Sequence, residues 1–512
     1  MTIILLAAFA GAAELSISLN IDPAAVILSQ QDSWTVVRLT AAPEGTVVLA
    51  TDEPGEPLLP VLSGNILIPP DARLRSIRIK VVEWQELGAG LKLYPVQPMR
   101  PLSRFNSVPF VAPSAEIYRS DLAYPAEMVQ AVPPGSKAGF RLAGFLFCPF
   151  AYHPVSGRLR LAQQAVLTVE YEAGSVPVAH LSPGQLTLMR EDVARLVVNH
   201  EDIERFAPAT AESDGPELDV AVITSSTLMP AVSSFASYLQ RKGYFTEVFA
   251  TESIYVRYPG RDNPEKIRNL LKELFVSRGL KYVVLAGDVQ HVPCRTGYLP
   301  YSPYNVPADL YYSDLDGTWD FNNNGQFGEY SYTSYNPDSV DLFSDIVVGR
   351  LPLDDASHLA NFLRKDTLYE RHPDTTYLRK VLLPFEALWS NIDYYGRIVN
   401  RNIALALSGI GAWTVDSVYN MSPSQCVASI NAGRHLFHFA GHGSVSAFGS
   451  TFSTSNLSSL TNTTMPVIVN SMACDCGNFD QQDGLGEQFI NATAGGAVST
   501  CLNARYGWGA PP

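Results

Sequence analysis

The chain has 512 residues, of which 46% are hydrophobic and 17% are charged. That length suffices for about three domains, and that composition excludes an intrinsically disordered protein. The 50 acidic and 36 basic residues give a net charge of -14, which argues against a nucleic-acid partner. No transmembrane span is expected, because no uncharged apolar run of about eighteen residues or more occurs.

Residues 1–13 form an apolar segment that ends on small residues, as the cleavage region of a signal peptide does. No Lys or Arg precedes the apolar run, so a buried first strand is the alternative. We interpret the segment as a signal peptide and expect a secreted or cell-surface protein. The six cysteines are too few for a disulfide scaffold, and their number fits either an exported enzyme with one or two bridges or a reduced protein.

Residues 14–187 are predicted to form a β-rich domain. Alternating runs such as SWTVVRLT and AVLTVEYEA have period two, and Pro/Gly turns separate them. No cluster of reactive side chains is found there. Residues 188–217 are predicted to contain a charged helix over 188–206 and then an exposed linker, because APATAESDGPE combines small residues, Pro and acids.

From Leu218 onward, apolar strands alternate with amphipathic helices. The strand LDVAVITS, the helix PAVSSFASYLQRKG and the later strand KYVVLAGD are examples. Alternation of this length predicts a parallel sheet that is covered by helices. A break near residue 370 divides the region into two units, 218–370 and 371–512.

Two reactive side chains directly follow apolar strands in the second unit. His442 follows HLFHFAG and Cys474 follows PVIVNSMA. Open α/β sheets carry their chemistry beyond the carboxyl ends of the strands, so we expect the two side chains to meet. A cysteine nucleophile needs a base within hydrogen-bond reach, and the charge of histidine changes near neutral pH. The alternative is that Cys474 is a buried apolar residue.

The order H-G-S, an apolar strand and A-C-x-x-x-x-F resembles the catalytic region of gingipain-type cysteine peptidases, which are bacterial, exported relatives of the caspase-like fold. VVLAGD at 283–288 and GRLP at 349–352 extend the resemblance over residues 218–512. The resemblance implies a caspase-like α/β three-layer sandwich with a mostly parallel sheet in two subdomains, preceded by an all-β pro-domain. The family's catalytic domain continues further, so we expect residues 371–512 to be C-terminally truncated.

The resemblance also implies roles for individual residues. Cys474 would be the nucleophile, because Phe479 lies five positions further on, and His442 would be the general base and acid. Gly443 and the amide of Cys474 would form the oxyanion hole, since glycine lets a substrate approach the backbone closely. Glu386, at the end of the strand LLPFEA, would orient the histidine; the alternative is an ordinary solvated loop residue.

Substrate specificity is left open by the residues near the expected pocket. Arginine-specific members of the family carry an acidic residue shortly after the glutamate, whereas this chain has Arg397 near that point. A basic P1 side chain would then meet a like charge. Asp393 lies close enough that a small shift in the alignment would restore an acidic pocket.

A loop at residues 314–329, DLDGTWDFNNNGQFGE, offers oxygen ligands at alternate positions around glycines. Oxygen ligands are those that calcium prefers, and crowded carboxylates repel one another unless a cation compensates them. The predicted ligands are Asp314, Asp316, Asp320, Asn322, Asn324 and Glu329. The alternative is an Asx-rich turn, because the loop lacks the final Glu of an EF-hand. A structural Ca²⁺ is expected, and no organic cofactor.

Together these features predict a secreted cysteine endopeptidase that is made as a zymogen, acts on protein or peptide substrates through a thioester, and binds its own pro-segment. Two alternatives remain. The first is a catalytically silent caspase-like binding or adhesion module, and the second is a surface transpeptidase that uses the same dyad.

Overall fold

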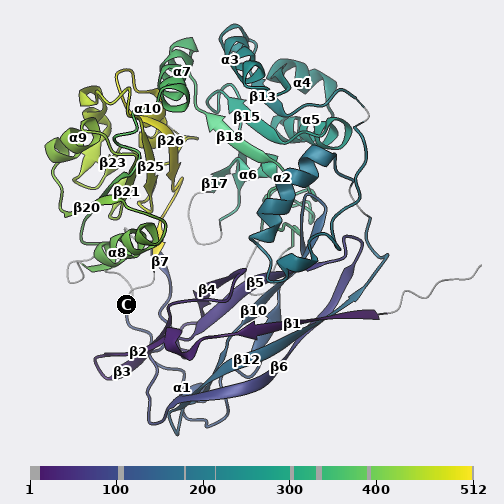
Figure 1. Ribbon diagram of the computed structural model, residues 1–512, viewed down its shortest axis with the longest axis vertical. Coiled ribbons are helices and arrows are strands. Elements are labelled where there is room, and N and C mark those ends of the chain that lie inside the picture. The colour runs from purple at the N-terminus through teal and green to yellow at the C-terminus, as the bar shows by residue number, and fades with distance from the viewer. Residues whose placement is uncertain are drawn as a thin grey trace, which may run out of the picture.

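The computed structural model describes residues 12–101, 109–177, 180–213, 215–299, 305–329, 337–388, 394–481 and 483–509. A strand-rich N-terminal part lies below two α/β units that stand side by side (Figure 1). Among the helices within the described ranges, none combines the length and apolar character needed to cross a bilayer.

The N-terminal part consists mainly of two antiparallel sheets. In the first sheet, β12 (Arg158–Glu172) lies between β1 (Ala12–Asn20) and β6 (Arg73–Gly88) and also pairs with β11 (Phe150–His153). The second sheet has the order β4 (Thr46–Ala50), β5 (Pro60–Ile68), β10 (Phe140–Phe147) and β8 (Val129–Ala131), with β9 (Gly135–Lys137) also on β10. The smaller elements are β2 (Val26–Gln31), β3 (Trp34–Leu39), β7 (Arg100–Pro101) and α1 (Ala115–Tyr118). Period-two alternation buries one face of each sheet, and residues such as Leu62, Phe145 and Leu167 form the shared core.

The helix that we predicted over 188–206 lies instead at α2 (Pro183–Ala194). It starts early because Ser182 and Gln185 form a capping box, with Pro183 in the first turn. It ends early because the Asn199 side chain bonds both backbone groups of Leu67, at 2.8 and 2.9 Å, which holds the following segment against β5. The boundary error therefore comes from a long-range contact that the local pattern does not contain.

The first α/β unit contains a parallel sheet in the order β14 (Thr246–Ala250), β13 (Val220–Thr224), β15 (Tyr282–Ala286) and β18 (Val347–Leu351). Its helices are α3 (Met229–Arg241), α4 (Thr251–Arg257), α5 (Asn263–Arg278), α6 (Leu310–Ser313) and α7 (Ala356–Arg371). A short hairpin pairs β16 (Arg295–Gly297) with β17 (Val306–Ala308). The all-buried β13 explains the continuous apolar run LDVAVITS.

The second α/β unit contains the parallel sheet that carries the candidate site. Its strand order is β20 (Thr414–Tyr419), β19 (Lys380–Phe385), β21 (Leu436–Phe439), β25 (Val467–Ser471) and β26 (Ala497–Leu502). The helices are α8 (Tyr394–Gly409), α9 (Pro423–Asn431) and α10 (Leu485–Asn491). Three two-residue strands, β22 (Gly443–Ser444), β23 (Ala447–Phe448) and β24 (Phe452–Ser453), follow β21, and β27 (Trp508–Gly509) follows β26.

The predicted fold class is confirmed, since a strand-rich part precedes an α/β part with two mostly parallel sheets. The first of these sheets ends at Leu351 and the second begins at Lys380. The sequence pattern missed α10, because the helix spans only 7 residues and starts directly after a glycine. The signal-peptide prediction falls mostly on residues outside the described ranges, although β1 already begins at Ala12.

Candidate active site

The register of two paired strands brings His442 and Cys474 to the same edge of the second sheet. β21 and β25 are parallel neighbours in which Phe439 pairs with Ser471. His442 and Cys474 each lie three residues beyond that pair. The Ser471 hydroxyl donates to the Phe439 carbonyl at 2.8 Å and so fastens the two strand ends together. The imidazole and the thiol therefore leave adjacent strands at equivalent positions.

The imidazole of His442 is oriented by a backbone carbonyl. Nε2 lies 2.5 Å from the carbonyl oxygen of Leu388, in the segment that follows β19. A carbonyl only accepts hydrogen bonds, so Nε2 carries the proton in the neutral ring. Nδ1 is then the nitrogen that can accept a proton from a nucleophile.

The thiol of Cys474 is buried, with 1% of the residue exposed. The amide of Gly507 donates to its sulfur at 3.3 Å. Because a hydrogen bond to the charged form of an ionisable group favours that form, this amide favours a thiolate. Gly507 belongs to the segment after β26, so the sulfur is held between the end of β25 and the chain that follows β26.

Gly443 lies directly against the loop that carries Cys474, which we call the cysteine loop. A Cβ atom added to it would stand 2.5 Å from the Cys474 carbonyl oxygen, 2.7 Å from the Ala473 Cβ and 2.8 Å from the Cys476 sulfur. No side chain larger than hydrogen fits there without a shift of backbone. The residue next to the candidate base and the residue that would be the nucleophile are therefore in contact.

Glu386 follows β19 and lies beside the segment that follows β21 and contains His442. Its amide donates to the Ala440 carbonyl at 3.0 Å, which links the ends of β19 and β21. Its carboxylate, however, accepts hydrogen bonds from the Ser450 amide (2.7 Å) and hydroxyl (2.8 Å) and from the Thr451 hydroxyl (3.1 Å). The carboxylate thus anchors the loop after β23, and its predicted role in orienting His442 stays a prediction.

The second cysteine of the C-x-C sequence, Cys476, is buried like the first. Burial raises the pKa of Cys476 to about 12, and its sulfur lies 3.4 Å from the Ala447 carbonyl oxygen. Burial also raises the pKa values of three other thiols to about 12: Cys148, Cys294 and Cys426. These four thiols stay protonated at neutral pH and are poor nucleophiles.

Arg397 lies near the same edge of the sheet. It is an exposed residue in the first turn of α8, and its guanidinium stands 5.8 Å from the centre of the Phe385 ring. Gly396 approaches the Phe385 Cβ and the Ala440 carbonyl, so the start of α8 covers the carboxyl ends of β19 and β21. Asp393, the alternative pocket residue, lies outside the described residues.

The predicted calcium ligands divide into two groups. The side-chain amides of Asn322 and Asn324 donate hydrogen bonds to the same Glu329 oxygen, at 2.9 and 2.6 Å. One carboxylate oxygen of Asp320 accepts a hydrogen bond from the backbone amide of Asn324 at 2.9 Å. The other oxygen of Asp320 accepts from Arg261 at 2.6 Å. These four predicted ligands therefore converge in one loop.

Asp314 and Asp316 belong to a different cluster. Their backbone carbonyl oxygens accept hydrogen bonds from the Arg268 guanidinium of α5. The Asp314 carboxylate accepts a hydrogen bond from the Trp319 indole N–H at 3.0 Å. Burial raises the pKa of Asp314 to about 7. The six predicted ligands are not brought together as one set.

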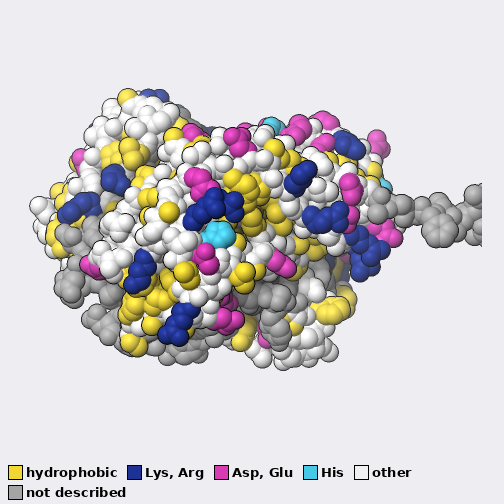
Figure 2. Space-filling model, turned by 90° about the horizontal axis from the view of Figure 1, so that it is seen from below, with side chains coloured by type: hydrophobic (Ala, Val, Ile, Leu, Met, Phe, Trp, Pro, Cys, Tyr) yellow, Lys and Arg dark blue, Asp and Glu magenta, His cyan; other side chains and the backbone are white. Residues whose placement is uncertain are grey.

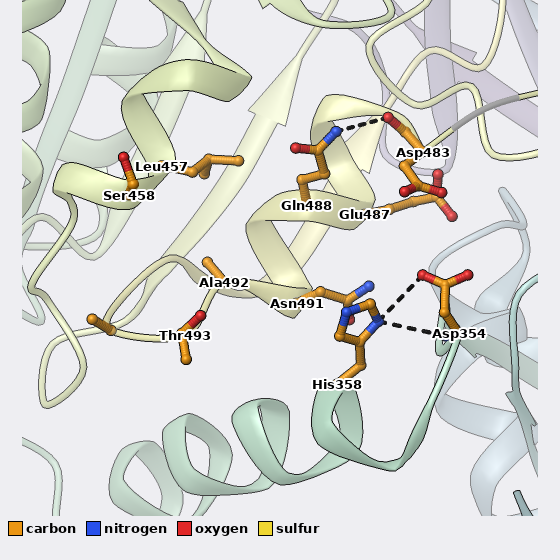
Figure 3. Close-up of a pocket in the computed structure, with 11 residues that line it drawn as sticks. Asp354, His358, Leu457, Ser458, Asp483, Glu487, Gln488, Asn491, Ala492 and Thr493 are labelled. Atoms are coloured by element: carbon orange, nitrogen blue, oxygen red, sulfur yellow. Dashed lines mark hydrogen bonds and ion pairs between the residues drawn. The ribbon is translucent and has the colours of Figure 1, made fainter.

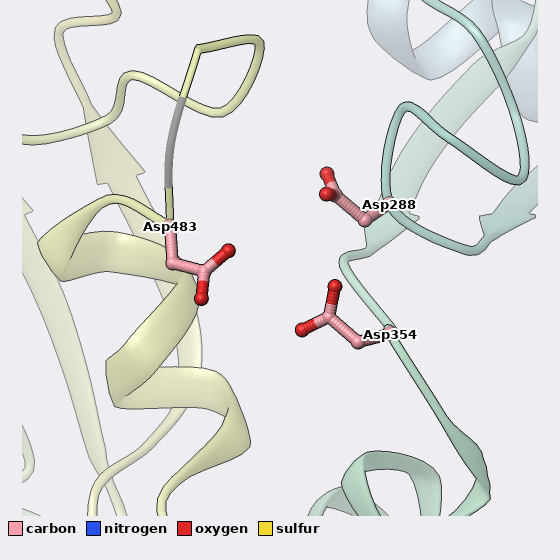
Figure 4. A group of neighbouring side chains, drawn as sticks. All are labelled: Asp288, Asp354 and Asp483. Atoms are coloured by element: carbon pink, nitrogen blue, oxygen red, sulfur yellow. The ribbon is translucent and has the colours of Figure 1, made fainter.

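Three loops bring a separate group of carboxylates together between the two α/β units. One oxygen from each of Asp288, Asp354 and Asp483 lies within 4.8 Å of the others (Figure 4). Burial, and after it the charges of Asp354 and Asp483, raises the pKa of Asp288. The Asp288 Oδ1 atom is buried and has no hydrogen-bond partner among the described residues. Such a set of oxygen atoms fits a hard divalent cation.

A cavity of about 530 Å³ adjoins these carboxylates. Asp354 and His358 line it from the α7 side, and Asp483, Glu487 and Asn491 line it from the α10 side (Figure 3). Burial, and after it repulsion by Asp288, Asp483 and Asp354, raises the pKa of Glu487 to about 8. Sequence reasoning missed this group, although Asp288 follows the strand VVLAG just as His442 and Cys474 follow theirs.

Within the described ranges, the strand-rich part contacts the α/β part through β7 and through the segment that contains β9. β7 pairs with β27 in antiparallel register, Trp508 opposite Pro101, immediately after the Gly507 amide that bonds the Cys474 sulfur. Elsewhere, the amides of Ser136 and Ala138 donate to Asp341 (2.7 Å) and Asp345 (2.6 Å).

The helix before the linker also docks on the first α/β unit. The Gln185 amide of α2 donates to the Phe275 and Leu280 carbonyls, both at 3.0 Å. The strand-rich part therefore contacts both α/β units. The face shown in Figure 2 carries Lys and Arg side chains scattered among acidic and apolar ones.

The fold and the site together define an α/β protein with a cysteine–histidine pair at the carboxyl edge of a parallel sheet and a strand-rich part beside it. The profile of peptidase family C25 matches residues 213–512, and the profile of the C25 propeptide matches residues 24–205. The chain therefore belongs to peptidase family C25.

Curated relatives are similar along most of the chain. Gingipain R2 of Porphyromonas gingivalis is 23% identical over 465 residues, which are 88% of this chain and 57% of that protein. Gingipain R1 of Porphyromonas gingivalis is 22% identical over 453 residues, which are 86% of this chain and 42% of that protein. The chain thus spans about half the length of the curated relatives that it matches.

Two solved structures are also similar. The crystal structure of the Arg-specific cysteine proteinase gingipain R is 19% identical, with a TM-score of 0.45, over 58% of this chain and 65% of that one. A complex of the pro- and mature domains of RgpB from Porphyromonas gingivalis is 20% identical, with a TM-score of 0.45, over 56% and 64%.

Proposed function

We propose that this chain is a cysteine endopeptidase that hydrolyses peptide bonds through Cys474 and His442 and is made as a zymogen. The observation that carries the proposal is the strand register, which sets both side chains three residues beyond the paired residues Phe439 and Ser471. Membership of a peptidase family supports it. We also propose that the protein is exported, on the apolar character of residues 1–13.

The proposed reaction follows from the groups around the sulfur. Nδ1 of His442 accepts the thiol proton, and the Gly507 amide stabilises the resulting thiolate. The thiolate attacks the peptide carbonyl, and the amides of Gly443 and Cys474 would bind the oxygen that becomes negative. The tetrahedral adduct then collapses to a thioester while His442 gives the proton to the leaving amine. A water molecule, deprotonated by His442, hydrolyses the thioester.

The zymogen proposal is supported by where β7 lies. A pro-segment strand that pairs with β27 occupies the edge next to Gly507 and leaves less room for an extended substrate. Residues 209–212 of the linker are exposed, and exposed segments of small and charged residues are where proteases cut. We propose that a cut between Arg190 and Glu217, most readily after Arg205, raises activity.

A structural calcium ion is proposed in the 320–329 loop. Asp320, Asn322, Asn324 and Glu329 converge there, whereas Asp314 and Asp316 are engaged near Arg268. An ion would have to displace Arg261 from one oxygen of Asp320. The carboxylates of Asp288, Asp354 and Asp483 offer a second place for a divalent cation. This is supported by the buried Asp288 Oδ1 atom, for which the described part of the chain supplies no hydrogen-bond partner.

The decisive experiment is a digest of a positional peptide library with the activated chain, its Cys474→Ala variant and its His442→Ala variant. Cleavage by the unaltered chain alone supports the proposal, and cleavage that survives in the Cys474→Ala variant excludes it. If Arg397 lines the pocket, peptides with a basic P1 residue are cleaved poorly.

Two further outcomes would select the alternatives. A chain that cleaves no peptide, and whose Cys474 alkylates no faster than an ordinary thiol, is a binding module. Accumulation of a product joined to an added amine, in place of the hydrolysed product, indicates a transpeptidase.

A further inference from the structure

The loop that carries Cys474 is held by a buried arginine that the proposed reaction does not use. Arg505 is 6% exposed, and its guanidinium forms a two-pronged ion pair with Asp480, at 2.9 and 2.7 Å. The Asp475 amide donates to the Arg505 carbonyl at 2.8 Å, and the Gly477 amide donates to the Asn503 carbonyl at 2.9 Å. The cysteine loop and the segment 503–507 therefore run alongside each other.

The same arginine connects the cysteine loop to the first α/β unit. Its Nε donates to the Asn305 carbonyl at 2.9 Å, just before β17. Two residues further along the chain, the Gly507 amide donates to the Cys474 sulfur at 3.3 Å. A planar guanidinium that bonds a carboxylate with two parallel hydrogen bonds fixes direction as well as distance.

We propose that Arg505 is a positioning residue, which acts through Asp480 and through its own backbone to hold the Gly507 amide against the Cys474 sulfur. This inference rests on the proposed role of Cys474 as nucleophile. Without the ion pair, segment 503–507 keeps its backbone hydrogen bonds to Asp475 and Gly477. It loses the side-chain contact that fixes its distance from the loop that carries Cys474. The amide then moves away from the sulfur, and the thiolate loses a hydrogen bond that favours it.

The test is the titration of Cys474 in the full chain, followed by the ultraviolet absorbance of the thiolate. Subtracting the titration of the Cys474→Ser variant isolates this one thiol and requires no reagent to reach it. The variants are Arg505→Lys, which keeps the charge but not the two-pronged pair, and Asp480→Asn, which keeps the shape but not the charge. We expect each to raise the pKa of Cys474 by about one unit, a tenfold loss of thiolate at a given pH below it.

Two variants distinguish a positioning effect on Cys474 from a general loss of stability. The Arg505→Lys/Asp480→Asn double variant should shift the titration no further than either single one, because the two residues act as a unit. The control is Arg434→Lys, which alters the arginine that pairs with Asp416 at 2.6 Å in the same α/β unit, away from the cysteine loop. It should leave the titration unchanged even if it lowers the melting temperature.

The outcomes distinguish this inference from the proposed function. If Cys474 of the unaltered chain titrates like an ordinary thiol, no activated nucleophile exists, and both ideas are overturned. If it titrates low and stays equally low in Arg505→Lys and Asp480→Asn, the reaction stands and the positioning role of Arg505 is excluded. If Arg434→Lys shifts the titration as much as Arg505→Lys does, the effect is general and the inference is likewise overturned.

Discussion

Gly443→Ala tests the contact between β22, which begins at Gly443, and the loop that carries Cys474. The added methyl group would stand 2.5 Å from the Cys474 carbonyl oxygen, and real Cβ atoms essentially never come closer to a heavy atom than 3.0 Å. The obstacle is backbone, which cannot rotate out of the way as a flexible side chain can. β22 and the cysteine loop must therefore separate by about 0.5 Å or more.

The expected consequences follow from that separation. Overpacking at a tight contact costs about 1–3 kcal/mol of unfolding free energy. A displacement of about 1 Å at reacting groups can cost about 100-fold in rate, so about half that displacement should cost at least about tenfold in kcat/KM. Both quantities are measurable on the same preparation, by urea denaturation and by cleavage of a peptide substrate after the linker has been cut.

The matched control is Gly409→Ala, which makes the same chemical change at the end of α8, where an added Cβ meets nothing within 4 Å. That variant should keep full activity and stability. A Gly443→Ala protein as active and as stable as the Gly409→Ala protein would refute the reasoning, because the contact with Cys474 would then be one that the fold relaxes at no cost.

Three further predictions test other parts of the molecule. Limited trypsin digestion should cut between Arg190 and Glu217 and raise peptidase activity, because the strand-rich part lies next to Gly507; an intact chain as active as the cut one would contradict the zymogen proposal. EDTA should lower the melting temperature, because a ligand of the folded state stabilises it by mass action, and an unchanged melt would leave the 320–329 loop an ordinary turn. Arg350→Met should lower the unfolding free energy by about 3–5 kcal/mol, measured by urea denaturation. The substitution leaves the Asp309 carboxylate without the two hydrogen bonds that it accepts from Arg350, at 2.6 and 2.7 Å. The Arg350→Met/Asp309→Leu variant should recover part of that loss, and an equal loss in both would show that the ion pair is not the cause.

The placement of the candidate site could be predicted from the sequence because it depends on a local rule. An apolar run that ends in a reactive side chain identifies both the strand and the edge at which its side chain emerges, and His442 and Cys474 follow that rule. The strand-rich part and the alternation of strands and helices were equally readable, since period-two and helical patterns are properties of neighbouring residues. Family resemblance added the roles that we predict for these side chains, which no pattern of hydrophobicity contains.

Tertiary structure decided which segments lie beside one another. β19 lies between β20 and β21, and this order brings Leu388 to His442. The carboxylates of Asp288, Asp354 and Asp483 come from three loops of two different units. The Arg505–Asp480 pair and the β7–β27 pairing likewise join segments far apart in the chain. The physical reason is that hydrophobic periodicity fixes the kind of element, whereas strand order and loop contacts depend on how the buried faces of all elements fit together.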